Sequence, residues 1–278
     1  MILMSKRILA AACAAATALA LSACSPSAST GGKTSKDGTL TVMASFYPLK
    51  YLAEKVGGEH VTVTSLTPDG AEPHDLELSP KMVDSLASAD AVVYLAGFQG
   101  AVDEAVEQHA PKTVIDVSPA AQLVAIDSTS NHPGEDEDTD EAQSGEAQSG
   151  EAADHDHEGH EHEGHDHEHA DHDHHHDMSM DPHFWLDPAR MANAATLVGD
   201  KLAEADPTNA ETYKANAQAL NEELTSLGDN LVAKTSTCQI KTFVTAHTAF
   251  GYLADRTGLT QVGISGLDPE SSPSPARL

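Results

Sequence analysis

Short apolar segments alternate with segments of helical periodicity, and this alternation restricts the fold more than any other feature of the chain. Strand-like runs occur at 40–44, 61–66, 91–95 and 114–116. Apolar residues at helical spacing occupy 47–56, 80–89 and 101–109. Ser79-Pro80 supplies an N-cap followed by a proline in the first helical turn. Strands joined by crossover helices pair in parallel and are covered on both faces, so we predict an α/β fold with a mainly parallel sheet.

The alternation stops at residue 127 and resumes at residue 181. Residues 127–180 have no periodicity, contain the tandem repeat EAQSG-EAQSG, and carry too few apolar residues to offset their ordering entropy. We therefore predict a disordered acidic insertion there. After it, helices are expected from Asp187-Pro188 to about Ala205 and from Thr208 to about Ala233. A strand, a helix and a strand are then expected at 242–245, 249–256 and 261–264.

This organisation predicts two α/β domains with mainly parallel sheets, linked by a long helical segment. Ser274 to Leu278 looks like the first turn of a further helix, so we expect the second domain to be incomplete. The predicted segments are a lipoprotein signal peptide (1–24), a tether (25–38), an N-terminal α/β domain (39–126), the His-rich insertion (127–180), the end of the N-terminal domain (181–187), a linking helical segment (188–235) and the start of a C-terminal α/β domain (236–278).

The N-terminus reads as an export signal. Lys6 and Arg7 precede an apolar stretch, 8–21, that is shorter than a membrane-spanning helix. The stretch ends in Leu21-Ser22-Ala23-Cys24, which is similar to the signal in which a bacterial lipoprotein is lipid-modified on its cysteine. The alternative is a plain signal peptide with an incidental Cys24. We expect an exported protein, anchored by lipid to the outer face of the cell membrane.

A run of histidine and acidic residues, 154–177, points to a divalent metal. It contains 11 of the 17 histidines: His155, His157, His160, His162, His165, His167, His169, His172, His174, His175 and His176. Neutral imidazole is a common ligand of Zn²⁺ and other first-row transition metals. The 18 acidic residues from Glu135 to Asp177 supply well over half of the net charge of −29, and the sequence shows no basic face for nucleic acid. The run is either a low-affinity zinc collector or sensor, or a solvated linker.

Three other histidines lie at predicted strand-to-helix junctions, where ligands of open α/β sheets bind. They are His74 in GAEPHDLELSP, His183 in DPHFWLDP and His247 in VTAHTAFGYL. Each alone would more often be a surface or capping residue, but together they could form a zinc site with a fourth position for a carboxylate or water. His60, His109 and His132 we assign to solvated surface. Cys238 is either buried and inert or paired outside this chain.

Several motifs together resemble the zinc-binding lipoproteins of ABC importers, which are grouped with adhesin lipoproteins that bind zinc or manganese. They are ASFYPLKYLAEKVGG, LTPDGAEPHDLELSPKMVDSLASADAVVYLAG, the His-rich loop, DPHFWLDP, KTFVTAHTAFGYLADRTGL and VGISGLDPESSPSPARL. The resemblance implies that His74, His183 and His247 ligate the metal between two domains, with a fourth carboxylate beyond Leu278. It also implies a monomeric receptor that delivers Zn²⁺ to a cognate permease and ATPase. Three imidazoles favour Zn²⁺ over Mn²⁺, although Mn²⁺ and other divalent metals stay open.

Other classes of function also stay open. A surface adhesin or metal store would use the folded part mainly to present the His-rich run. A zinc hydrolase is disfavoured because the sequence contains no HExxH motif and no recognisable general base. We therefore expect a binding protein and not an enzyme.

Overall fold

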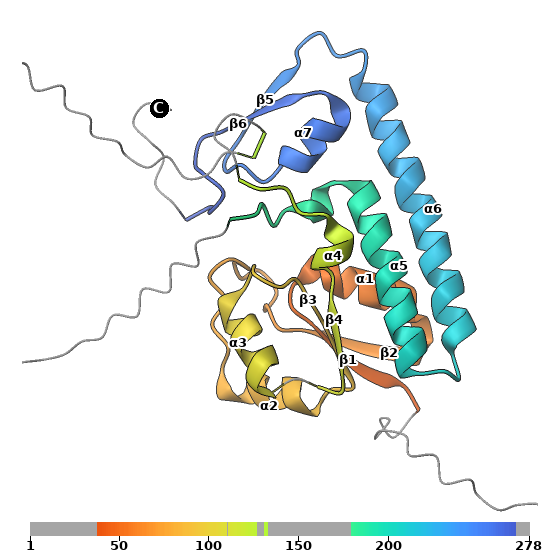
Figure 1. The fold of residues 1–278 in the computed structure, drawn as a ribbon. Coiled ribbons are helices and arrows are strands. Elements are labelled where there is room, and N and C mark those ends of the chain that lie inside the picture. The colour runs from red at the N-terminus through yellow and green to blue at the C-terminus, as the bar shows by residue number, and fades with distance from the viewer. Residues whose placement is uncertain (1–37, 110, 127–130, 133–178, 271–278) are drawn as a thin grey trace, which may run out of the picture. The chain divides into compact units, whose positions relative to one another are not determined.

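Strands and helices alternate in the structure as the sequence predicts (Figure 1). The structure is a computed structural model that describes residues 38–109, 111–126, 131–132 and 179–270. The elements are β1 (Leu40–Ala44), α1 (Tyr47–Gly57), η1 (Gly58–His60), β2 (Val61–Ser65), α2 (Pro80–Ser88), β3 (Ala91–Tyr94), α3 (Gly100–His109), β4 (Thr113–Asp116), α4 (Ser118–Ala121), η2 (Phe184–Leu186), α5 (Pro188–Ala205), α6 (Ala210–Thr235), β5 (Thr242–Thr245), α7 (Gly251–Thr257) and β6 (Thr260–Gly263), where η marks a 3₁₀ helix.

The first four strands form one parallel sheet in the order β2-β1-β3-β4. Val42 of β1 is in register with Val63 of β2 and with Ala91 of β3. Helical crossovers connect the strands, which is the connection that parallel neighbours require. The carboxyl ends of β1 and β2 therefore lie at the same edge of the sheet, where the following loops gather.

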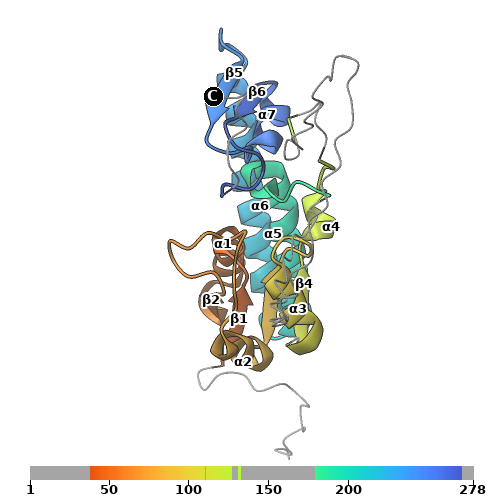
Figure 2. The same cartoon turned by 90° about the vertical axis from the view of Figure 1, so that its left-hand side faces the viewer.

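Helices cover both faces of this sheet (Figure 2). Along β1, Val42 and Ala44 pack into the core formed with α1, α5 and α6, whereas Met43 packs on the opposite side with residues of α2 and α3. Successive side chains of a strand point to opposite faces, so a nearly continuous apolar strand fills two cores. The two cores fix the position of the loops at the sheet edge.

α5 and α6 run side by side as an antiparallel pair (Figures 1 and 2). Asp187 caps the start of α5 by accepting a hydrogen bond from Ala189 N at 2.9 Å, and Pro188 occupies the first turn. Gly199 allows close contact, because a Cβ there would lie 2.5 Å from Ala217 Cβ on α6. The pair packs tightly where α6 also contacts α1.

A second parallel sheet contains β5 and β6, which are connected through α7. Gly258 ends α7 in the left-handed conformation, with a φ of 65°. Arg256, in the last turn of α7, forms an ion pair with Asp187 at the start of α5. Val244 of β5 is 67% exposed, so this sheet carries apolar surface that the described residues do not cover.

The predicted α/β fold class is confirmed, with the helix and strand bounds within about two residues of expectation. α6 begins at Ala210 and not at Thr208. The predicted domain boundaries stay a prediction. The signal peptide, the tether before residue 38, and residues 127–130 and 133–178 of the insertion lie outside the described residues. Within the described residues, no helix combines the length and the apolar character that a bilayer crossing needs.

Candidate metal centre

The structure brings together the three histidines at the predicted junctions. His74 lies in the turn after β2, His183 lies directly before η2, and His247 lies in the bend between β5 and α7. The ring centroids are 5.2 Å apart for His74 and His183, 5.4 Å for His183 and His247, and 6.1 Å for His74 and His247. Residues that are more than 170 positions apart in the sequence thus form one cluster.

The spacing of the rings is close to that around a shared zinc ion. With Zn–N bonds of about 2.1 Å and tetrahedral angles, the centroids of two imidazole ligands lie about 5.2 Å apart. Two of the three measured distances agree with this value, and the third is longer by less than 1 Å. Across the described residues, no three His, Cys, Asp or Glu side chains are already arranged as a complete ligand set. The distance between His74 and His247 is the one that departs most from the value for a shared ion.

A carboxylate two residues earlier holds each of the first two histidines. Glu72 Oε1 accepts from the backbone N of His74 at 3.2 Å and lies 2.5 Å from its Nδ1. Asp181 Oδ1 accepts from the backbone N of His183 at 2.9 Å and lies 2.8 Å from its Nδ1. In both cases a proline, Pro73 or Pro182, stands between the acid and the histidine. Proline restricts the preceding residue to extended conformations, which suits a carboxylate that turns back onto the backbone two residues on.

These contacts fix the orientation and tautomer of both rings. A carboxylate only accepts hydrogen bonds, so Nδ1 of His74 and of His183 carries the proton and Nε2 keeps its lone pair. Both Nε2 atoms are buried without a hydrogen-bond partner. A buried nitrogen without a partner is costly unless it has another ligand. The pair therefore fits a metal ion that takes both lone pairs, with carboxylate partners of the kind that metal-bound histidines usually have.

The two carboxylates differ in their environment. Burial acts to raise the pKa of Glu72, but the hydrogen bonds from His74 and the nearby charges of His74 and His247 lower it overall. Burial likewise opposes ionisation of Asp181, and hydrogen bonds from His132 and His183 outweigh it, so its pKa is also lowered. The side chain of Asp181 is fully buried, whereas that of Glu72 is 36% exposed.

Aromatic rings form the wall behind the histidines. The Phe98 ring lies 5.0 Å from the His74 ring, and the Trp185 ring lies 5.1 Å from the His183 ring. Buried Gln99 donates from Nε2 to Pro73 O at 2.8 Å, which fixes the turn that carries His74. A cavity of about 300 Å³ lies beside this wall, with Trp185 and Pro73 in its lining but none of the three histidines. The wall limits rotation of the rings and lowers the local dielectric constant.

His247 is held less firmly than the other two. It is only half-buried, and no described carboxylate hydrogen bonds to its ring. Burial lowers its pKa, and repulsion from the protonated forms of His183 and His74 adds to this, against the opposing charges of Glu72 and Asp268. A lowered pKa keeps the imidazole neutral, which is the state that binds metal.

Other predicted site residues have no structural test. The 11 histidines of the run from 154 to 177 and Cys24 lie outside the described residues, and the fourth carboxylate beyond Leu278 stays a prediction. Cys238 is exposed, so the alternative of a buried, inert thiol is wrong.

Sequence reasoning missed three residues near the site. Glu72 and Asp181 could have been found from the repeated pattern of an acid, a proline and a histidine. His132 was assigned to solvated surface, and this is wrong because it is 1% exposed and contacts Asp181. No local signal identifies His132, since its partners lie 49 and 123 positions away.

Comparisons with known proteins identify the family of the chain. The family described as zinc-uptake complex component A, periplasmic (ZnuA), matches residues 42–278. The zinc-binding lipoprotein AdcA of Streptococcus pneumoniae (strain ATCC BAA-255 / R6) is 34% identical over 245 residues, which are 87% of this chain and 42% of AdcA. The high-affinity zinc uptake system protein ZnuA of Bacillus subtilis (strain 168) is 31% identical over 265 residues, which are 95% of this chain and 73% of that protein.

A solved structure shows the same fold. The laminin-binding protein Lmb of Streptococcus agalactiae, described as a bifunctional protein with adhesin and metal transporting activity, superposes with a TM-score of 0.62 at 26% identity. The match covers 86% of this chain and 72% of Lmb. The chain spans less than half the length of the AdcA protein that it matches. It spans a larger share of the lengths of ZnuA and Lmb. Because the family match extends over most of the sequence and includes all three clustered histidines, the chain belongs to the ZnuA family of zinc-uptake proteins.

Proposed function

We propose that this protein is the extracytoplasmic receptor of a zinc importer. His74, His183 and His247 bind one Zn²⁺ ion, and the protein delivers it to a cognate permease and ATPase without catalysing a reaction. The pair of buried Nε2 atoms without partners, on His74 and His183, is the observation that carries the proposal. Export and a lipid anchor on Cys24 would keep the receptor at the outer face of the membrane, beside its permease.

The donor set supports zinc as the ion. Three imidazoles with a fourth carboxylate or water suit Zn²⁺, whereas Mn²⁺ prefers more oxygen ligands. The net charge of −29 also favours a cation. We expect Zn²⁺ to bind more tightly than Mn²⁺ when the two compete for the purified protein.

Alanine substitutions test the site directly. The insertion adds many weak zinc sites, so a chain that lacks residues 154–177 is the appropriate background. In it, H74A, H183A and H247A should each weaken zinc binding by more than the roughly 10–100-fold typical of losing an outer partner of a ligand. H109A, which changes an exposed histidine on α3, is the matched control and should leave the affinity unchanged. Tight zinc binding by H183A, measured by competition with a chelator, would exclude the site.

The His-rich run is proposed to collect zinc for this site. The chain segments on either side of the insertion that contains the run meet beside His183: Ala125 pairs with Met180, and Asp181 N donates to Val124 O at 2.9 Å. Ions held on the run would thus be concentrated close to the ligands. Removing residues 154–177 should slow zinc uptake by cells at limiting zinc and leave it unchanged at ample zinc. Equal uptake at limiting zinc would leave the run as a linker.

A second candidate function is adhesion. The likeness to Lmb, a protein described as both adhesin and metal transporter, favours it. Immobilised laminin is the probe. Binding of laminin by the zinc-loaded protein at concentrations near those of a known adhesin would support this function, and it would add to zinc capture without replacing it.

A further inference from the structure

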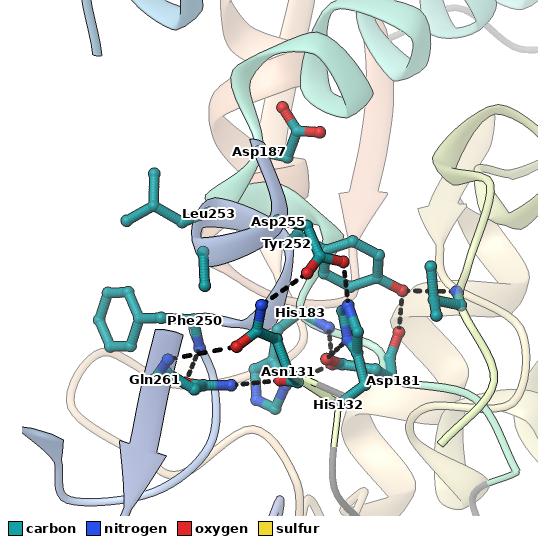
Figure 3. Close-up of polar contacts among 12 residues, drawn as sticks. Asn131, His132, Asp181, His183, Asp187, Phe250, Tyr252, Leu253, Asp255 and Gln261 are labelled. Atoms are coloured by element: carbon teal, nitrogen blue, oxygen red, sulfur yellow. Dashed lines mark hydrogen bonds and ion pairs between the residues drawn. The ribbon is translucent and has the colours of Figure 1, made fainter. Parts of the chain in front are cut away.

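The pair Asn131–His132 lies at the centre of a hydrogen-bond network that reaches the candidate metal centre (Figure 3). His132 Nδ1 is 2.5 Å from Asp181 Oδ2, and its Nε2 is 2.9 Å from Asp255 Oδ2. Carboxylates only accept, so both ring nitrogens donate and the ring bridges two acids. The ring is 1% exposed, as a bridging group inside the protein should be.

Asp181 connects this bridge to a candidate ligand. One carboxylate oxygen accepts from His132, and the other accepts from Nδ1 of His183 at 2.8 Å. The Asp181 side chain is fully buried, so water does not replace a lost partner easily. Without His132, the oxygen that faces it would lack a donor, and the carboxylate would be free to rotate away from His183.

Asn131 attaches the same segment to the part of the chain that carries His247. Its Nδ2 donates to Asp255 Oδ1 at 2.7 Å, and its backbone O accepts from Gln261 Nε2 at 2.6 Å. Asp255 lies on α7, which begins four residues after His247. The pair therefore spans from the acid behind one candidate ligand to the helix next to another.

The pair fits closely against the start of α7. A Cβ at Gly251 would lie 2.5 Å from Asn131 O and 2.7 Å from Nδ1 of His132. Neither contact is possible for a real Cβ, so any larger residue at this position would displace the pair. The ring of Tyr252 lies 4.6 Å from that of His132, and its hydroxyl donates to Asp181 O at 2.6 Å. Packing and hydrogen bonds together leave His132 a single position.

We propose that His132 is a positioning residue for zinc binding. It holds the Asp181 carboxylate in place, and this carboxylate fixes His183 in the tautomer whose Nε2 lone pair can bind the ion. The bridge to Asp255 ties this orientation to α7 and hence to the segment of His247. The inference rests on the proposed function, because His183 must be a zinc ligand for its orientation to affect affinity.

Two substitutions separate the halves of the bridge. H132N keeps a donor near the place of Nδ1 and loses the contact with Asp255. H132Q keeps a donor near the place of Nε2 and loses the contact with Asp181. In the zinc-free protein, ¹⁵N NMR of the imidazoles should show His183 protonated on Nδ1 in the parent and in H132N, and a mixture of tautomers in H132Q. H109N is the matched control for replacing a histidine at the surface.

Zinc affinity provides the second readout, measured by chelator competition on the chain without residues 154–177. H132Q should weaken zinc binding by about tenfold or more, and H132N should stay within about threefold of the parent. If the two variants lose affinity equally while the tautomer of His183 is unchanged, His132 has a structural role only and the proposal is wrong. If the parent chain has no tight zinc site, the proposed function fails instead, and the tautomer measurement still reports on His132.

A third variant guards against misfolding of H132Q. G251A changes no titratable group but displaces the Asn131–His132 pair through the added Cβ. It should produce the same mixture of His183 tautomers and a similar loss of zinc affinity. A folded G251A protein with an unchanged tautomer and affinity would contradict the proposal.

Discussion

Replacing the two carboxylates behind the histidines should affect zinc binding unequally. D181N keeps an oxygen that accepts from His183, but it removes the charge and presents an amide to His132. E72Q makes the equivalent change behind His74. The structure predicts the larger effect for D181N, because Asp181 is fully buried and accepts from three donors, whereas Glu72 is 36% exposed and accepts from two.

The magnitude follows from the contacts that are lost. Removing an outer partner of a metal-bound histidine costs about 10–100-fold in affinity, which corresponds to about 1.4–2.8 kcal/mol. We expect D181A to lie in this range and D181N near its lower end. D181A also leaves three donors without this partner, at about 1–3 kcal/mol each: Nδ1 of His132, Nδ1 of His183 and the backbone N of His183. The zinc-free D181A protein should therefore lose about 3–9 kcal/mol of unfolding free energy.

Two measurements on one set of variants test this reasoning. Chelator competition gives the zinc affinity, and urea denaturation of the zinc-free proteins gives the unfolding free energy. Both use the chain without residues 154–177, so that zinc sites on the run do not contribute. If E72Q weakened zinc binding more than D181N did, burial would not be the factor that sets the strength of these contacts, and the reasoning would be refuted.

Three further predictions concern pH and packing. Zinc affinity should fall as the pH drops from 8 to 5, because protons compete with the ion for the imidazoles. The lowered pKa of His247 means that this residue becomes protonated only at lower pH. An affinity that does not change over this pH range would contradict the site. Burial acts to lower the pKa of His132, but its two acidic partners raise it overall, so its stabilising contribution is complete below about pH 6.5 and is lost as the pH rises through the folded-state pKa. Thermal melts of the zinc-free protein and of H132Q should therefore differ most near pH 5–6 and converge in alkali. G199A should destabilise the protein by about 1–3 kcal/mol, because its Cβ would lie 2.5 Å from Ala217 Cβ. G228A should stabilise α6 by up to about 1 kcal/mol, because the nearest atom to its Cβ would lie 3.6 Å away. Changes of melting temperature with the same sign for both variants would refute the packing argument.

Local patterns predicted most of the fold, because they report on local physics. The apolar run at Leu40–Ala44 and the proline at the start of α5 are local signals, and both elements formed where they were expected. The three histidines were also found from local patterns, but only His74 and His247 follow strands, β2 and β5, and these strands belong to different sheets.

Long-range contacts were beyond this reasoning. His132 lies next to an acidic, apolar-poor stretch, and its sequence neighbourhood looks solvent-exposed. Its burial comes from Asp255, which is 123 positions away on α7, and from Asp181 across the insertion. Glu72 and Asp181 are intermediate cases. Each contacts a histidine two residues later, which is a local contact, but its role near the site depends on His74 and His183 lying close together in the fold.

The long helix α6 has a consequence for how the ion enters and leaves. Its 26 residues extend about 39 Å and contact α1, α5 and α7. Moving the β5–β6 sheet away from the four-stranded sheet would bend α6 or break its packing. His74 and His247, in contrast, lie in a turn and a bend outside helices and strands. In the proposed receptor, we therefore expect ion exchange to need movement of those short segments alone. Solution scattering curves of the zinc-free and zinc-loaded protein should then superpose.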